Sequence, residues 1–180
     1  MASLFGHTAA ALTVGKLSPY SSKRKLFWLL LCLVSVLPDF DVVAFVFHIP
    51  YSSQWGHRGF THSYLFALVV ALLVTTLAFR QIRLFSKDWF VVLASFFAAG
   101  ASHPQLDALT NGGLGVALYW PFDLGRYFHH YRPIEVSPIG ITQFFSAWGL
   151  EVLQSEFVFI LLPCLFLLSI QYLCKKTLSR

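Results

Sequence analysis

The sequence predicts an all-α protein, a polytopic integral-membrane helical bundle of about four to five membrane helices with a long loop or lid on its outer face. Of the 180 residues, 57% are hydrophobic and only 12% are charged, whereas a soluble domain carries about 25% charged residues. The apolar residues form long runs that short basic clusters flank. No linker, repeat or low-complexity tract divides the chain, so we expect a single domain over residues 1–180.

Five segments are helix candidates, and in chain order they are residues 3–15, 26–47, 63–79, 89–101 and 157–174. A spanning helix needs about 20 residues, so the third and fifth are long enough and the fourth must extend through Leu109. The second is interrupted by the sequence PDFD, and the first is short enough to cross only partly. The first segment has its basic residue after its apolar part, the reverse of a cleaved signal peptide, so we expect it to be retained.

A long connection runs from Thr110 to Glu156 and is rich in glycine, proline and aromatic residues. Loops of this length inside a compact domain usually carry function. We expect a lid or an interfacial element here, with a short helix near residues 139–153.

The basic residues indicate an orientation, because Lys and Arg near membrane ends stay on the cytoplasmic side. If the long runs all cross, ten residues share that side: Lys16, Lys23, Arg24, Lys25, Arg80, Arg83, Lys87, Lys175, Lys176 and Arg180. Residues 48–62 and 107–156 then lie outside. We therefore expect a multi-pass protein of a bacterial inner (cytoplasmic) membrane, with its polar residues facing the periplasm or the exterior.

Histidine and aspartate residues from separate segments fall at one predicted depth. Asp39, Asp41, His62, His103 and Asp107 each lie 14 to 20 residues from the nearest basic cluster. At 1.5 Å per helical residue this is roughly 20–30 Å, close to the outer boundary. His7 is expected somewhat deeper in the same direction.

Imidazole and carboxylate groups together are ligands of zinc, manganese and iron. His103 and Asp107 are four residues apart and share one face of a helix. Asp39 and Asp41 flank a proline-marked break, where one can bind an ion while the other orients a ligand. Ionisable groups at membrane depth are costly unless they pair with each other or with a metal. The convergence of four segments therefore favours a metal site.

Each motif alone has a simpler interpretation. A single histidine at a membrane edge is more often a hydrogen-bonded packing residue. The sequence PDFD alone is typical of a helix stop followed by a cap, and Thr61 and Ser63 are candidates for caps of the following helix. Only the combination points to an ion.

The motifs resemble a known family. GHTA, LPDFD, GHRGFTHS and SHPQLDALTNGG followed by YWPF occur in the order and approximate spacing of the YdjM-like proteins, described as predicted membrane-bound metal-dependent hydrolases. The resemblance covers roughly residues 4–122 and implies hydrolase chemistry without identifying a substrate. It implicates His7, Asp39, Asp41, His57, Arg58, His62, His103 and Asp107. The chain departs from the pattern at Pro104 and Gln105, and we expect Pro104 to bend a helix or begin a new one there.

These observations lead to the hypothesis of a metal-activated water. One or two divalent cations, with zinc favoured over manganese or iron, would be held by His7, Asp39, Asp41, His62, His103 and Asp107. Three further residues are candidate catalytic groups: Arg58 as a phosphate-binding fork, His57 as a catalytic group or a ligand, and Glu151 as a general base or further ligand. Each of two candidates has a simpler interpretation. For Glu151 it is a position on a solvated helix face, and for Arg58 it is a pairing with lipid headgroups at the membrane rim.

A site at the membrane surface makes a lipid or lipid-linked phosphoester the natural substrate, with membrane lipids as partners. Nucleic acid is not expected, because the net charge of +5 comes from short clusters rather than a stripe. The cysteines show no CxxC spacing, so we expect packing roles for them. Two alternative functions remain, a metal or proton transporter and a metal-stabilised scaffold without catalysis. The sequence predicts no oligomeric state.

Overall fold

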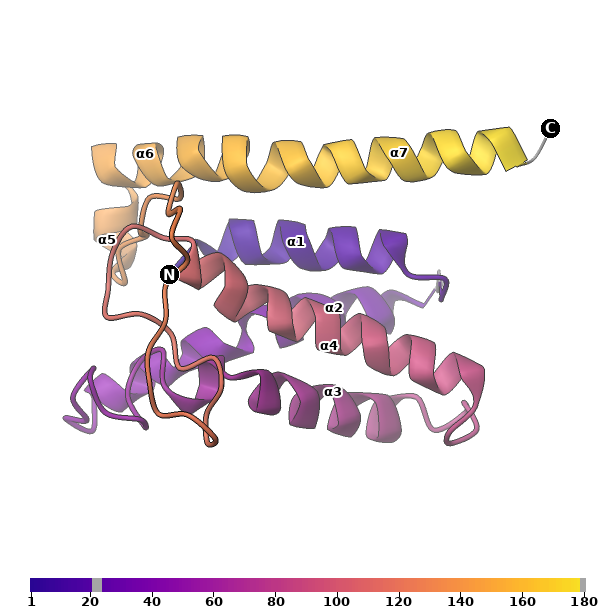
Figure 1. Ribbon diagram of the computed structural model, residues 1–180, viewed down its shortest axis with the longest axis horizontal. Helices are drawn as coiled ribbons and strands as arrows, with labels where there is room; N and C mark the ends of the chain where they lie inside the picture. Colours follow the sequence, from indigo (N-terminus) through magenta and orange to yellow (C-terminus); the bar gives the residue numbers. More distant parts are fainter. Residues whose placement is uncertain (21–23, 179–180) are drawn as a thin grey trace.

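The computed structural model describes residues 1–20 and 24–178 (Figure 1). Within this part the chain is helical, with two isolated β-bridges and no strand, so the all-α prediction is confirmed. The α-helices are α1 (Leu4–Leu17), α2 (Lys25–Val36), α3 (Tyr64–Ala78), α4 (Lys87–Ala108), α5 (Ile141–Phe144), α6 (Ala147–Glu156) and α7 (Leu162–Leu178). Two 3₁₀ segments, η1 (Leu37–Phe45) and η2 (Phe60–His62), and one π-helical segment, η3 (Phe157–Leu161), complete the set.

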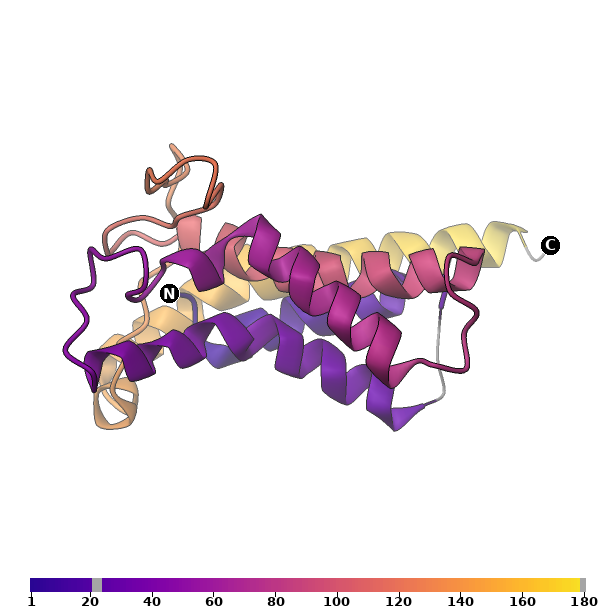
Figure 2. The ribbon, with the colours of Figure 1, turned by 90° about the horizontal axis from the view of Figure 1, so that it is seen from below.

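The helices lie side by side along the long axis of the molecule (Figures 1 and 2). Helix α4 packs against α1, α2 and α3, and α1 also contacts α7. Helices α6 and α7 are joined through η3 into one long helix that runs beside α1. The long connections gather at one end of the bundle, and the C-terminus lies at the other.

Serine side chains begin three of the helices. Ser3, Ser63 and Ser86 accept hydrogen bonds from backbone N–H groups three residues further on, at 3.4, 3.1 and 3.3 Å. These are N-caps, which satisfy donors that the first helical turn leaves unpaired. The capping role expected of Ser63 is therefore confirmed.

Two expectations for local structure need correction. Helix α4 runs unbroken through Pro104 to Ala108, so no new helix begins there; its packing against α1, α2 and α3 offsets the backbone hydrogen bond that proline removes. The short helix expected near residues 139–153 is split between α5 and α6, and α6 continues toward the C-terminus. The irregular part of the loop thus ends near Ser146.

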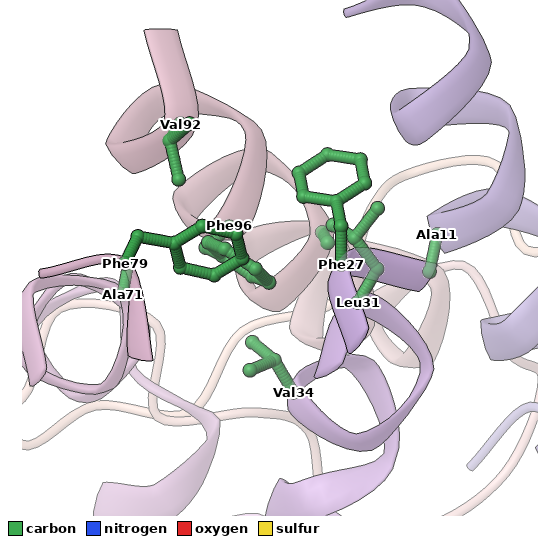
Figure 3. Close-up of a cluster of buried hydrophobic side chains, with 9 residues drawn as sticks. Ala11, Phe27, Leu31, Val34, Ala71, Phe79, Val92 and Phe96 are labelled. Carbon is green, nitrogen blue, oxygen red and sulfur yellow. The ribbon is translucent and has the colours of Figure 1, made fainter. Parts of the chain in front are cut away.

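An apolar core fills the half of the bundle that contains the starts of α2 and α4 (Figure 3). The rings of Phe27 and Phe79 each lie 5.5 Å from that of Phe96, measured between centroids. Ala71 and Ala99 are completely buried beside them, and small side chains of this kind allow helices to approach closely. The core leaves the opposite end of the bundle for polar residues.

Two helical stretches of the described chain, Lys25–Phe45 and Ala147–Leu178, are long and apolar enough to span a membrane. This is fewer than the four to five predicted. Helices α1 and α3 have only 14 and 15 residues, and α4 gains its length from a polar last turn and a half. In the second stretch only 6% of the most apolar window is buried, so its apolar side chains face outward.

The helix ends that carry the predicted cytoplasmic cluster lie together at one end of the bundle (Figure 1). They are the end of α1, the start of α2, the connection from α3 to α4 and the end of α7. Lys23 and Arg180, which the prediction assigned to the same face, lie outside the described residues.

Candidate metal centre

Four elements bring histidine and aspartate side chains together at the end of the bundle away from the apolar core. His7 comes from the first half of α1, Asp39 from η1, His62 from η2, and His103 and Asp107 from the end of α4. The side chain of Asp39 is 13% exposed, and those of the other four are completely buried. The predicted convergence of separate segments is therefore present.

Four donor atoms in this cluster have the spacing of a single ion's ligands: Asp39 Oδ1, His62 Nε2, His103 Nε2 and Asp107 Oδ2. The two imidazole nitrogens are 3.1 Å apart. Asp39 Oδ1 lies 3.3 Å from His103 Nε2 and 3.6 Å from His62 Nε2. Asp107 Oδ2 lies 3.4 and 3.9 Å from His62 and His103. Ligand atoms that surround a zinc ion as a tetrahedron at about 2.0–2.1 Å lie about 3.3–3.4 Å from one another. The residues present therefore fit this ion.

In His62 and His103, the contacts of the Nδ1 atoms determine which ring nitrogen faces the centre. His103 Nδ1–H donates to the carbonyl oxygen of Ser35 at 2.6 Å. His62 Nδ1 lies 3.1 Å from a carboxylate oxygen of Asp41, which can only accept. Since each Nδ1 carries a hydrogen, each Nε2 presents a lone pair. Two lone pairs 3.1 Å apart need a proton or a cation between them, and this outer hydrogen bonding is typical of metal-binding histidines.

His7 lies against the same cluster without a partner of its own. Its ring stacks on that of His103, with centroids 3.7 Å apart. Its Nε2 is 3.4 Å from Asp107 Oδ1 and 3.9 Å from Asp39 Oδ2. Both ring nitrogens of His7 and Oδ1 of Asp39 are buried and make no hydrogen bond to the described residues. Such atoms are costly unless a bound group satisfies them, which also fits a metal.

The centre is strongly acidic, because Asp39, Asp41 and Asp107 surround it. Burial disfavours a charged imidazole, but the attraction of the Asp107, Asp39 and Asp41 carboxylates outweighs burial and raises the pKa of His62 to about 10. A site that pulls a proton onto a buried imidazole so strongly attracts any cation.

Asp41 organises the groups that surround these donors. It accepts from His57 Nδ1 at 2.5 Å, from the Thr61 hydroxyl at 2.7 Å and from the Arg58 backbone N–H at 3.1 Å. A second group of potential ligands, Asp41, His57 and His62, is therefore already joined by hydrogen bonds through the Nδ1 atoms. This geometry favours Asp41 as the residue that orients two histidines, and Asp39 as the one that faces the ion.

Arg58 points into the protein. It is completely buried, and it donates to Asp107 Oδ2 from Nε at 3.1 Å, to the Gly112 carbonyl at 2.9 Å and to Thr110 Oγ1 at 3.0 Å. Its backbone φ of 59° is uncommon for a residue with a side chain. The expected phosphate-binding fork is thus engaged internally, where it holds Asp107 in place.

The turn that carries Arg58 depends on glycine. A Cβ atom at Gly59 would lie 2.1 Å from the carbonyl oxygen of Gln54, which is far inside van der Waals contact. Arg126 also stabilises this turn. It donates from Nη1 to the His57 carbonyl at 3.0 Å and from Nη2 to the Tyr51 carbonyl at 2.9 Å.

Of the two glutamates of α6, the structure brings Glu156 near the centre and not the candidate Glu151. Glu151 is exposed and lies apart from both ligand groups, so the structure does not bring it to the site. Glu156 is buried and accepts hydrogen bonds from the backbone N–H and hydroxyl of Ser3. The preceding N–H, that of Ala2, donates to Asp107 Oδ1 at 2.7 Å. The signal that could have revealed Glu156 is a lone carboxylate at the start of an apolar helix.

An outward-facing apolar helix and a buried His/Asp cluster at one end of a helical bundle define a membrane protein with a candidate metal centre. The chain belongs to the YdjM family, since the family model described as YdjM inner membrane protein matches residues 1–178. It is 36% identical over 137 residues to inner membrane protein YbcI of Escherichia coli (strain K12), covering 76% of this chain and 77% of that protein. No solved structure matches the chain. The resemblance inferred from the motifs is thereby confirmed.

Proposed function

We propose that this chain is a multi-pass hydrolase of the inner membrane that uses one divalent cation, most simply zinc, to cleave a phosphoester of a lipid or lipid-linked substrate. The observation that carries the proposal is the set of four donor atoms from η1, η2 and α4, separated by 3.1–3.9 Å. Residues this distant in sequence meet with ligand spacing only if the fold is built around them.

A cation bound by these residues supplies a Lewis acid, which polarises a phosphoryl oxygen and makes a water acidic enough to attack near neutral pH. The chain's own residues prepare for that chemistry. Ser35 and Asp41 hold His103 and His62 with Nε2 inward, and Asp39 is the one donor of the four that solvent reaches. We place the approach of water on the Asp39 side.

His57 is the proposed general base. Its Nδ1 lies 2.5 Å from Asp41 Oδ1, so Asp41 orients the ring and stabilises it when protonated, as in other His/Asp pairs. His57 also lines a cavity of about 340 Å³ together with Tyr51 and Gln143. In this assignment Arg58 is a positioning residue for Asp107, and Glu151 has no role.

The proposed topology places the basic helix ends in the cytoplasm and the centre toward the periplasm. Helices α1, α3 and α4 then cross or partly cross the bilayer beside the two longer spans. A lipid phosphoester is the proposed substrate because the centre would lie where headgroups meet the hydrocarbon.

A transporter is less compatible with the described residues. A transport path needs polar groups through the whole thickness of the membrane. Between the centre and the basic helix ends, the described core is built on Phe27, Leu31 and Phe96. The buried polar side chains described there are hydroxyls rather than ionisable groups: Thr13, Ser18, Thr75 and Ser95. A metal-stabilised scaffold stays the alternative to an enzyme, since three of the four donor side chains are completely buried.

The test is metal analysis and lipid hydrolysis on protein purified in detergent. We expect about one zinc per chain in the wild type and its loss in His103→Ala and Asp107→Ala. The Glu151→Gln variant, with its change on an exposed part of α6, is the matched control and should keep both metal and activity. Metal that persists in both centre variants would reject the site. Bound metal with no hydrolysis of any phosphomonoester or phosphodiester lipid would reject the enzyme and favour the scaffold.

A further inference from the structure

Three cavities follow one another along the N-terminal half of α1. The first, of about 340 Å³, contains His57 and is lined on its polar side by Tyr51 and Gln143. The second, of about 250 Å³, shares Met1 and the turn at residues 137–140 with the first. The third, of about 270 Å³, shares Phe5 with the second and lies between α1 and the junction of α6 and η3. Shared wall residues make the three cavities neighbours, and we refer to the three together as the cleft.

The lining becomes more apolar along this line, since Tyr51, His57 and Gln143 belong only to the first cavity. The second cavity is walled by Phe5 and by Ile141 and Phe144 of α5, and the rings of Phe5 and Phe144 stack with centroids 6.1 Å apart. The third is walled by Ala9, Leu153 and further apolar residues of η3. Phe5 and Ile141 are 60% and 78% exposed. Exposed apolar side chains are ordinary on a membrane protein, but here they line cavities, where an apolar ligand would gain from contact with them.

The occupant that suits the apolar part is a hydrocarbon chain. A bound peptide would need partners for its own N–H and C=O groups. The third cavity offers only the Glu156 carboxylate, which Ser3 already occupies through two hydrogen bonds. A hydrocarbon chain needs no partner and gains from contact with apolar walls.

The position of the cleft brings that chain from the bilayer. One wall belongs to the stretch Ala147–Leu178, one of the two that can span a membrane. The π-helical segment η3 supplies Phe157 and Ile160 to the wall, and π-helical turns within α-helices occur frequently at functional sites.

We propose that the three cavities bind one membrane lipid, with a single hydrocarbon chain between α1 and the α6–η3 junction and the phosphate-bearing headgroup beside His57. The assignment of the headgroup rests on the proposed function, whereas the path of the chain rests on the cavities alone. The cleft thus selects an amphiphile whose polar end reaches the catalytic groups while its chain remains in the protein.

Photolabelling tests the path of the chain without catalysis. The probe is phosphatidylglycerol with a diazirine in the middle of one acyl chain, added to vesicles that contain the full-length protein treated with EDTA. We expect crosslinks at Leu153 and Ile160 in clear excess over those at Leu165 and Leu173, which lie on the exposed part of α7. Equal labelling along α6, η3 and α7 would mean ordinary boundary lipid and would overturn the proposal.

A pair of variants sharpens the result. Ala9→Phe places a ring in the third cavity and should abolish labelling at Leu153 while leaving that at Leu165. Ala10→Phe adds the same ring at a neighbouring position outside the cavity lining and should change neither. Labelling at Leu153 that survives Ala9→Phe counts against the path. The wild-type labelling map decides the question alone if Ala9→Phe does not fold.

The headgroup has its own test. Diacylglycerol with the same diazirine chain should label Leu153 much less than the phospholipid, and equal labelling would reject the phosphate assignment. Hydrolysis with uniform labelling would reject the cleft and keep the hydrolase. Cleft-specific labelling without hydrolysis would reject the hydrolase and keep the cleft.

Discussion

Replacing Asp39 by asparagine is the cleanest perturbation of the centre. The side chain of Asp39 makes no hydrogen bond among the described residues, and its Oδ1 is buried near His103 and His62. Asparagine has the same shape but no charge. The substitution therefore removes one anionic ligand and leaves the surrounding structure its other contacts.

The magnitude follows from the linkage between metal binding and stability. Zinc at 100 times the wild-type Kd stabilises the protein by about 2.7 kcal/mol, which is a rise in Tm of about 5–11 °C for a chain of this size. If Asp39→Asn weakens zinc about 100-fold, the same zinc concentration contributes only about 0.4 kcal/mol. The rise in Tm then shrinks to about 1–2 °C.

The assay is thermal unfolding in detergent with EDTA and with added zinc. Without metal, Asp39→Asn should lower Tm by no more than about 2–4 °C, because it removes one of the three carboxylates that attract protonated His62 but breaks no hydrogen bond of the described fold. Glu151→Gln serves as the control and should keep the full zinc response. A zinc response of wild-type size in Asp39→Asn, or a large loss of Tm without metal, would refute the reasoning.

Three further predictions concern other parts of the structure. Arg58→Lys should destabilise the protein by about 3–5 kcal/mol in denaturant unfolding, because a lysine cannot replace the fork that holds Asp107; a loss below about 1 kcal/mol would show that the buried pair is dispensable. Raising the pH from about 6.5 to 8.5 should increase the zinc-induced rise in Tm. In the metal-free protein the pKa of His62 is raised to about 10, so protonated His62 contributes its full stability below about pH 6.5 and loses part of it by pH 8.5. A zinc-induced rise that shrinks as the pH increases would contradict this. Phe96→Ala should cost about 3–5 kcal/mol through a core cavity while zinc content stays at the wild-type level, and joint loss of zinc would show that the two halves of the bundle are not independent.

The residue types of the candidate centre, and the gathering of these residues at one end of the bundle, could be predicted from the sequence. Asp39, His62, His103 and Asp107 were assigned one depth by counting from basic clusters, and the structure brings them within ligand spacing. The depth of a residue can be predicted in this way because a helix rises by a fixed amount per residue, so position along the chain converts directly to depth.

The direction of individual side chains could not be predicted in this way. Arg58 turns inward because its φ is positive and its turn is closed by glycine, features that only tertiary contacts fix. Glu151 and Glu156 are equally plausible in sequence, and their difference in burial depends on which face of α6 meets α1. The number of spanning helices was overestimated because short helices can be apolar when they pack on one another.

Helices α1 and α4, together with η1 and η2, each contribute part of the polar centre, although in a bilayer apolar helices gain little free energy from leaving lipid for one another. A cation bound by residues from these segments would link them, where apolar contacts alone hold them together only weakly. Assembly of this end of the bundle would then wait until α4, the last of these segments to be synthesised, is in place, so that acquiring the ion completes folding rather than following it.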